Sequence, residues 1–201
     1  ITYIRQDEPR GLAEGVLLAR RFLGDDDFVM YLGDNILQDG VADIAEEFRA
    51  RRPAAQIVVQ KVADPTGYGV AEVDSEGAVQ RLVEKPSHPH TDLAIVGVYF
   101  FTPAIHDAVA AIRPSARGEL EITDAIQWLI DQGRTVSPYV ISGWWKDTGK
   151  LEDMLEANRI VLDGLERRID GEVFKSELVG KVVIEPGARV EAGGQIGTVE
   201  S

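Results

Sequence analysis

The fold of this chain is decided by the stretch FVMYLGDN, residues 28–35, a continuous apolar run that ends in a Gly-Asp-Asn turn. A short apolar run bounded by turn residues predicts a buried strand. Apolar residues recur at helical spacing over 12–23, and a second helical stripe over 41–48 and a second β-rich run over 57–62 follow the quoted stretch. This alternation of helix and strand predicts an α/β fold with a mostly parallel sheet that helices cover.

The middle of the chain departs from this alternation. GVAEVD at 69–74 and AVQRLVEK at 78–85 are separated by a Ser-Glu-Gly turn, which predicts a β-hairpin inserted into the sheet. We place the end of the main domain at Gly164, so that this domain covers residues 1–164. The rest of its pattern predicts a strand, two helices, a strand and a helix, at 93–101, 103–112, 122–130, 135–142 and 151–162.

The last part of the chain has a different rhythm. VVIEPGARV at 182–190 has the small apolar residues and the Pro-Gly pair of hexapeptide repeats, so we predict that residues 165–201 begin a β-helix tail. A rival interpretation is a carrier-domain fragment, because VEAGGQIGTVES at 190–201 resembles half of a biotinyl or lipoyl motif. No lysine lies within that stretch to carry such a group, which favours the β-helix.

Composition limits the classes of function that are open. The 201 residues include 21 basic and 34 acidic side chains, and the net charge of −13 argues against a general binder of nucleic acid or of anionic membranes. The absence of cysteine excludes disulfides, thiolate catalysis and cysteine-ligated zinc. No apolar run approaches the roughly 20 residues of a membrane helix. We therefore expect a compact cytoplasmic protein.

Two aspartates follow predicted strands and are candidate metal ligands. Asp34 comes directly after the apolar run of residues 28–32, and Asp147 lies in the stretch WWKDTG at 144–149. Ligands of open α/β sheets bind at the carboxyl ends of strands, and Mg²⁺ usually takes one or two carboxylates together with substrate phosphates. The two residues could therefore share one Mg²⁺. An Asx turn at Asp34 and a helix cap at Asp147 explain the same residues without a metal.

Other polar residues are less specific. Glu84 and Lys85 close the predicted hairpin, where the lysine can meet a phosphate and the glutamate can accept hydrogen bonds from sugar hydroxyls. A solvated surface ion pair explains them equally. The glycines of TGYGV, residues 66–70, allow a ligand to approach the backbone, but a bare turn also accounts for them. Arg117 lies in a Gly-containing loop before a helix, and the three histidines show no metal-ligand spacing.

Seven short motifs lie between residues 1 and 164. In chain order they are YIRQDEPRGLA (3–13), GDN (33–35), GYGV (67–70), VEKP (83–86), VGVYF (96–100), RGELEITD (117–124) and WKDTG (145–149). Together and in this order they resemble the sugar-phosphate nucleotidylyltransferases, and within that family the thymidylyltransferases that act on glucose 1-phosphate. The tail resembles the start of the left-handed β-helix that extends the longer members of the family.

The resemblance implies a fold, a reaction and a set of site residues. The fold would be the Rossmann-like, nucleotide-diphospho-sugar transferase type. The reaction would transfer a thymidylyl group from dTTP to α-D-glucose 1-phosphate with Mg²⁺, giving dTDP-glucose and pyrophosphate. The implied residues are Gln6 and Gly11 at the pyrimidine base, Asp34 and Asp147 at the metal, Gly69, Glu84, Val96 and Tyr99 at the sugar, and the catalytic cations Lys85, at the sugar phosphate, and Arg117 nearby.

The resemblance also implies parts that these residues do not supply. A Gly-rich triphosphate loop, a following Arg and a further catalytic Lys are expected before Ile1, and no GxGxxG or P-loop pattern occurs in the sequence. We therefore expect an N-terminally incomplete catalytic domain that turns over poorly alone. The alternatives are transfer of a uridylyl, guanylyl or adenylyl group to a sugar 1-phosphate, and a non-catalytic module that binds sugar nucleotides. Assembly into a homo-oligomer is left open.

Overall fold

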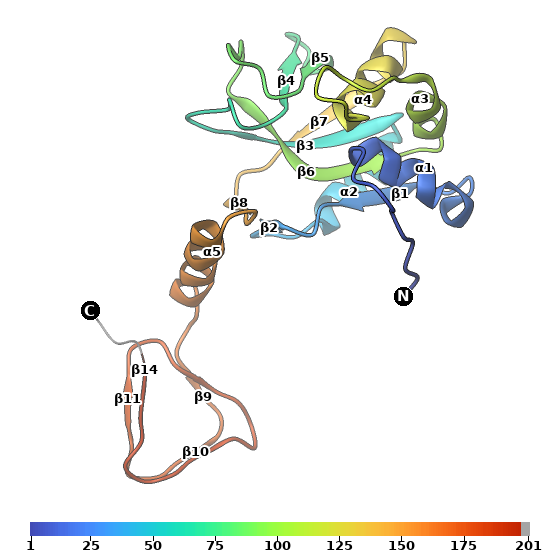
Figure 1. Ribbon diagram of the computed structural model, residues 1–201. Coiled ribbons are helices and arrows are strands. Elements are labelled where there is room, and N and C mark those ends of the chain that lie inside the picture. The colour runs from blue at the N-terminus through green and yellow to red at the C-terminus, as the bar shows by residue number, and fades with distance from the viewer. Residues whose placement is uncertain (198–201) are drawn as a thin grey trace. The chain divides into compact units, whose positions relative to one another are not determined.

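The computed structural model describes residues 1–197, which divide into two compact units. The first unit runs from Ile1 to Asp147, and the second begins at Thr148. The division falls before the last helix, whereas the sequence predicts that the main domain ends after it, at Gly164. The helices are α1 (Leu12–Leu23), α2 (Ala42–Arg51), α3 (Ile105–Ala111), α4 (Ile122–Asp131) and α5 (Leu151–Asp163) (Figure 1).

Strand β6 (Leu93–Phe101) is the centre of the first unit. Its sequence LAIVGVYFF contains no charged residue, and it is buried along its whole length, as strands covered on both faces are. The other strands of this unit are β1 (Phe28–Tyr31), β2 (Asn35–Leu37), β3 (Ala55–Lys61), β4 (Val70–Val73), β5 (Val79–Val83), β7 (Val136–Val140) and β8 (Trp145–Asp147).

Helices cover both faces of the central sheet (Figure 1). On one face, Val16 of α1, Ile105 of α3 and Ile126 of α4 belong to a large apolar cluster with side chains of the sheet. On the other face, Ile44 and Phe48 of α2 belong to a second, smaller cluster. Since each helix places one apolar stripe against the sheet, the predicted α/β architecture is confirmed.

The central sheet is mixed. Its order is β5-β4-β6-β3-β7, and β1 also pairs with β6. In the described part of this sheet only β3 and β7 pair in parallel, while β6 runs antiparallel to β1, β3 and β4. Parallel neighbours need a crossover connection, usually a helix. The chain passes from β3 to β6 through the β4–β5 hairpin, and the helices α3 and α4 come only before β7. The expectation of mostly parallel pairing is therefore corrected.

The second unit contains α5 and two turns of short strands. The strands are β9 (Arg168–Ile169), β10 (Glu172–Val173), β11 (Glu177–Val179), β12 (Val183–Ile184), β13 (Arg189–Val190) and β14 (Gln195–Gly197). β9 pairs with β12, β10 with β13 and β11 with β14, each in parallel, and the pairs form the sides of a triangle (Figure 1). These turns lie where the sequence predicts the start of a left-handed β-helix, which stays a prediction. Residues 198–201 of the predicted tail lie outside the described residues.

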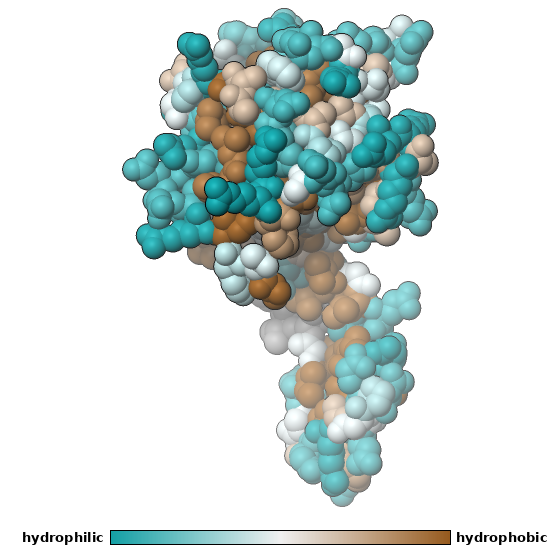
Figure 2. Space-filling view, turned by 90° about the vertical axis from the view of Figure 1, so that its right-hand side faces the viewer, coloured by the Kyte–Doolittle hydropathy of each residue, from teal (hydrophilic) through white to brown (hydrophobic). Residues whose placement is uncertain are grey.

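The surface of the molecule is mainly hydrophilic in the view of Figure 2, with smaller hydrophobic patches between the polar residues. This agrees with the net charge of −13. Large apolar side chains that are exposed include Tyr3, before α1, and Phe22, near its end. None of the helices within residues 1–197 is both long enough and apolar enough to cross a membrane.

Candidate active site

A small pocket in the first unit collects most of the candidate residues. It has a volume of about 140 Å³, and segments from many parts of the chain line it. Among the residues predicted from the sequence, it is lined by Asp34, Gly69, Glu84, Lys85, Tyr99 and Asp147. Its other lining residues are Leu12, Leu32, Asn35, Gly67, Tyr68, Ile95, Gly97 and Trp145. The structure therefore brings the two aspartates and the Glu84-Lys85 pair to one place.

The two aspartates meet through a separate antiparallel pair of strands, β2 and β8. In its register Asn35 lies opposite Asp147, and Leu37 lies opposite Trp145. Cα atoms of directly opposed residues in such a pair are about 4.5–5.5 Å apart. Because Asp34 directly precedes Asn35, it lies at the same end of the pair as Asp147. This strand pair, rather than the central sheet, brings the two carboxylates together.

The side chain of Asn35 joins three segments of the pocket wall. Its Oδ1 accepts hydrogen bonds from the backbone N–H of Gly97 in β6 (3.2 Å) and from Nε1 of Trp145 in β8 (2.6 Å). Its Nδ2 donates to Oδ1 of Asp34 (2.8 Å). A Cβ on Gly97 would lie 2.6 Å from that Nδ2, so Gly97 must lack a side chain for Asn35 to fit. The sequence prediction missed Asn35 as a site residue, although the GDN motif contains it.

Glu84 is held in the pocket wall by a hydroxyl and two cations. Its Oε2 accepts a hydrogen bond from Oγ1 of Thr123 (3.2 Å), and its Oε1 lies 3.6 Å from Nη1 of Arg117 and 4.0 Å from Nζ of Lys85. A Cβ at Gly69 would lie 3.1 Å from Oε2, so glycine gives the carboxylate room. Burial raises the pKa of Glu84, and these three partners oppose the rise.

Arg117 is not among the residues that line the pocket. Its guanidinium is 3.6 Å from Oε1 of Glu121 and 3.2 Å from Oε1 of Glu119, in addition to its contact with Glu84. Three carboxylates therefore share this one cation. Lys85 lines the pocket directly, and about half of its side chain is exposed. Of the two predicted catalytic cations, Lys85 is thus the one that a ligand in the pocket can contact.

Tyr99 and Val96 point to opposite faces of β6. Tyr99 lines the pocket, and burial raises the pKa of its hydroxyl. Val96 is fully buried in the second apolar cluster, with Val58 and Phe100. Side chains an odd number of residues apart in a strand face opposite ways, so the side chain of Val96 does not line the pocket. The placement of Val96 at the sugar stays a prediction, and it could be met only by the backbone of this residue.

Gln6 and Gly11 do not line the pocket, although Leu12, the neighbour of Gly11, does. Gly11 has a φ of +108°, and a Cβ there would lie 2.5 Å from the carbonyl oxygen of Leu120. The backbone N–H of Leu120 donates to the carbonyl oxygen of Arg10 (2.7 Å). The motifs YIRQDEPRGLA and RGELEITD are thus in direct backbone contact, which only a glycine at position 11 permits.

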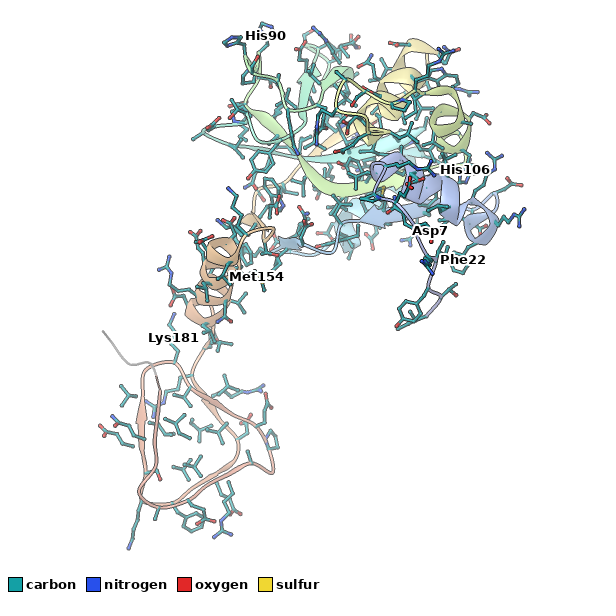
Figure 3. All side chains as sticks on the ribbon, viewed as in Figure 1. Asp7, Phe22, His90, His106, Met154 and Lys181 are labelled. Atoms are coloured by element: carbon teal, nitrogen blue, oxygen red, sulfur yellow. The ribbon has the colours of Figure 1, made fainter. Side chains whose placement is uncertain are left out.

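Two carboxylates, Asp34 and Asp147, are the metal-ligand candidates in the pocket. Within residues 1–197 no three or more side chains of His, Asp or Glu form a group that could hold a metal ion. An ion between the two aspartates would therefore take its remaining ligands from substrate or water. Figure 3 shows His90 and His106 in separate parts of the first unit. His106 is a buried residue of α3, and burial lowers its pKa.

Known proteins of one family match the chain. A family model for nucleotidyl transferases matches residues 1–164. Glucose-1-phosphate thymidylyltransferase of Streptomyces antibioticus is 60% identical over 192 residues, which are 94% of this chain and 54% of that protein. The chain therefore spans about half the length of this curated relative.

Solved structures share the fold. A Bacillus anthracis protein assigned as a glucose-1-phosphate thymidylyltransferase, crystallised with sucrose, has a TM-score of 0.72 at 35% identity, over 79% of this chain and 64% of that one. UDP-glucose pyrophosphorylase in complex with UDP-glucose has a TM-score of 0.72 at 26% identity, over 81% of this chain and 66% of that one. Both likenesses confirm the predicted fold class.

Proposed function

The chain belongs to the nucleotidyl transferase family, and from this premise we propose that the protein transfers a thymidylyl group from dTTP to α-D-glucose 1-phosphate. The products would be dTDP-glucose and pyrophosphate. The observation that carries the proposal is that Asp34, Glu84, Lys85 and Asp147 line one pocket. The 60% identity to a glucose-1-phosphate thymidylyltransferase supports the choice of nucleotide and sugar.

The chemistry joins two anions. An oxygen of the sugar phosphate attacks the α-phosphorus of dTTP, the bond from that phosphorus to the bridging β-phosphate oxygen breaks, and pyrophosphate leaves. Neutralising charge and aligning the two phosphates are then the main catalytic tasks. Lys85 would contact the phosphate of glucose 1-phosphate, because it lines the pocket and its side chain is half exposed. Arg117 would act through Glu84, whose carboxylate it holds at 3.6 Å.

The sugar would bind between Glu84 and Tyr99. The carboxylate of Glu84 can accept hydrogen bonds from sugar hydroxyls, and Thr123 and Arg117 hold it in one position. The backbone at Gly69 lies next to this carboxylate without a side chain to block approach. Val96 could meet a sugar through its backbone alone, since its side chain lies in the opposite cluster.

Asp34 and Asp147 would hold Mg²⁺. Their hard carboxylate oxygens match the one or two carboxylates that this ion usually takes from a protein, and phosphate oxygens would complete its coordination. When bound, the ion would offset the repulsion between the substrate phosphates. Nδ2 of Asn35 donates a hydrogen bond to Oδ1 of Asp34 (2.8 Å), so this contact helps to orient the carboxylate of Asp34.

The test is a turnover assay on the full-length protein. Pyrophosphate release is measured with dTTP, UTP, GTP and ATP, each paired with glucose 1-phosphate. We expect the highest kcat/KM with dTTP. A higher value with UTP would instead support uridylyl transfer, the second candidate, which the likeness to UDP-glucose pyrophosphorylase favours. If the protein binds a sugar nucleotide but releases no pyrophosphate with any of the four triphosphates, the result would support a non-catalytic binding module.

A further inference from the structure

The buried carboxylate of Glu14 organises the segment that leads into α1. Glu14 lies in the first turn of α1, and 5% of it is exposed. Its Oε1 accepts hydrogen bonds from Nε and Nη2 of Arg10, at 2.7 and 2.6 Å. Its Oε2 accepts from Nε2 of Gln6 at 2.6 Å and from the backbone N–H of Arg10 at 3.3 Å. Each oxygen thus receives two hydrogen bonds, which fills the acceptor sites of a carboxylate.

The charge on Glu14 decides which way the amide of Gln6 points. The hydrogen bond from Gln6 is the largest effect on the pKa of Glu14, and together with the contacts of Arg10 it holds that pKa below its usual value although burial raises it. An ionised carboxylate can only accept hydrogen bonds. The atom of Gln6 that faces Glu14 must therefore be Nε2. Gln6 is exposed on the segment that passes Asp7 toward α1 (Figure 3), so its Oε1 is the amide atom available to a ligand.

We propose that Glu14 is a positioning residue that selects the pyrimidine base. By holding Nε2 of Gln6, it presents Oε1 to the ring and favours a base that donates a hydrogen bond from N3. Thymine and uracil carry a hydrogen on N3, whereas N3 of cytosine is an acceptor and would face another acceptor. The inference rests on the proposed function and on the expectation, implied by the family resemblance, that Gln6 contacts the base. Sites built to receive an N–H reject an analogue that lacks it.

The experiment measures base discrimination in the full-length protein. The quantity is the kcat/KM for dTTP divided by the kcat/KM for dCTP, with glucose 1-phosphate as the second substrate. Glu14→Gln replaces the carboxylate by an amide that can donate as well as accept, so the amide of Gln6 is free to turn over. We expect the ratio to fall about tenfold to a hundredfold, with the KM for glucose 1-phosphate unchanged.

Two further variants separate positioning from a general effect on the fold. Glu8→Gln is the matched control, because Glu8 is also an acid near Arg10, at 4.0 Å, but is exposed. It should leave the ratio unchanged. In a Gln6→Ala background, Glu14→Gln should cause no further change in the ratio, since Glu14 acts through Gln6. If Glu14→Gln does not fold, as judged by thermal unfolding, Glu14→Asp keeps the charge for Arg10, withdraws the carboxylate from Gln6 and should also lower the ratio.

The outcomes distinguish this inference from the proposed function. A wild-type protein that releases no pyrophosphate from dTTP and glucose 1-phosphate contradicts the proposed function. A protein that transfers thymidylyl groups but keeps its dTTP-to-dCTP ratio in folded Glu14→Gln or Glu14→Asp overturns the role of Glu14. A further fall of the ratio when Glu14→Gln is added to Gln6→Ala overturns it as well.

Discussion

Replacing Asn35 by alanine is expected to destabilise the protein, because it removes the acceptor of two hydrogen bonds. These come from the backbone N–H of Gly97 (3.2 Å) and from Nε1 of Trp145 (2.6 Å). A buried donor left without a partner costs about 1–3 kcal/mol. Gly97 lies in a fully buried strand, whereas Trp145 is partly exposed and can turn to water. We therefore expect a loss of about 2–3 kcal/mol, which lowers the thermal midpoint by roughly 4–12 °C in a domain of this size.

The measurement is thermal unfolding of the full-length protein, followed by circular dichroism. Asn35→Asp keeps an acceptor for Gly97 and Trp145, but it loses the donor to Asp34 and buries a further carboxylate beside it. Because neighbouring carboxylates repel each other, this variant should also lower the thermal midpoint, and it should lose turnover. A midpoint shift below about 2 °C in Asn35→Ala would refute the reasoning, since the two donors would then find other partners at no cost.

The remaining predictions concern the charged groups of the pocket. Asp34→Asn or Asp147→Asn should abolish most turnover at saturating Mg²⁺, and the double variant should be scarcely worse than the poorer single one, because residues that act as a unit are non-additive. Near-normal rates would remove that residue from the metal site. Lys85→Ala should raise the KM for glucose 1-phosphate about tenfold to a hundredfold and change dTTP binding little; equal losses for both substrates would argue against its assignment to the sugar phosphate. Because the pKa of Glu84 is raised in the folded protein, this residue contributes stability at low pH that is lost as the pH rises above 4.5, the ordinary value. Glu84→Gln should therefore make the free energy of unfolding depend less on pH in that range, which urea titrations at several pH values measure.

The elements that bury an apolar face could be predicted from the sequence. β6 occupies the predicted residues 93–101, α1 the predicted residues 12–23, and the β4–β5 hairpin lies where the Ser-Glu-Gly turn places it. In each case the buried face shows in the sequence as apolar residues at a period of 2 or 3.6, or as an unbroken apolar run. The direction of a strand leaves no such pattern in the sequence. It depends on where each connection ends, which is why the pairing of β6 needed the structure.

The site shows the same division. The sequence marks Glu84 and Lys85 as candidates because they close the hairpin, and the pocket contains both, while their roles stay predictions. β2 and β8 are three residues long each, too short to show an alternating pattern. Those two strands nevertheless bring Asp34 beside Asp147.

Asn35 is one of the groups that order this arrangement. Its Nδ2 donates to Asp34, while its Oδ1 holds both Trp145 of β8 and the backbone of β6. Asn35 therefore contacts both strands of the pair and also donates to one of the two carboxylates. The pairing of β2 with β8 therefore also places Asp34 beside Asp147. A substitution that disrupts this pairing should weaken the candidate metal site as well.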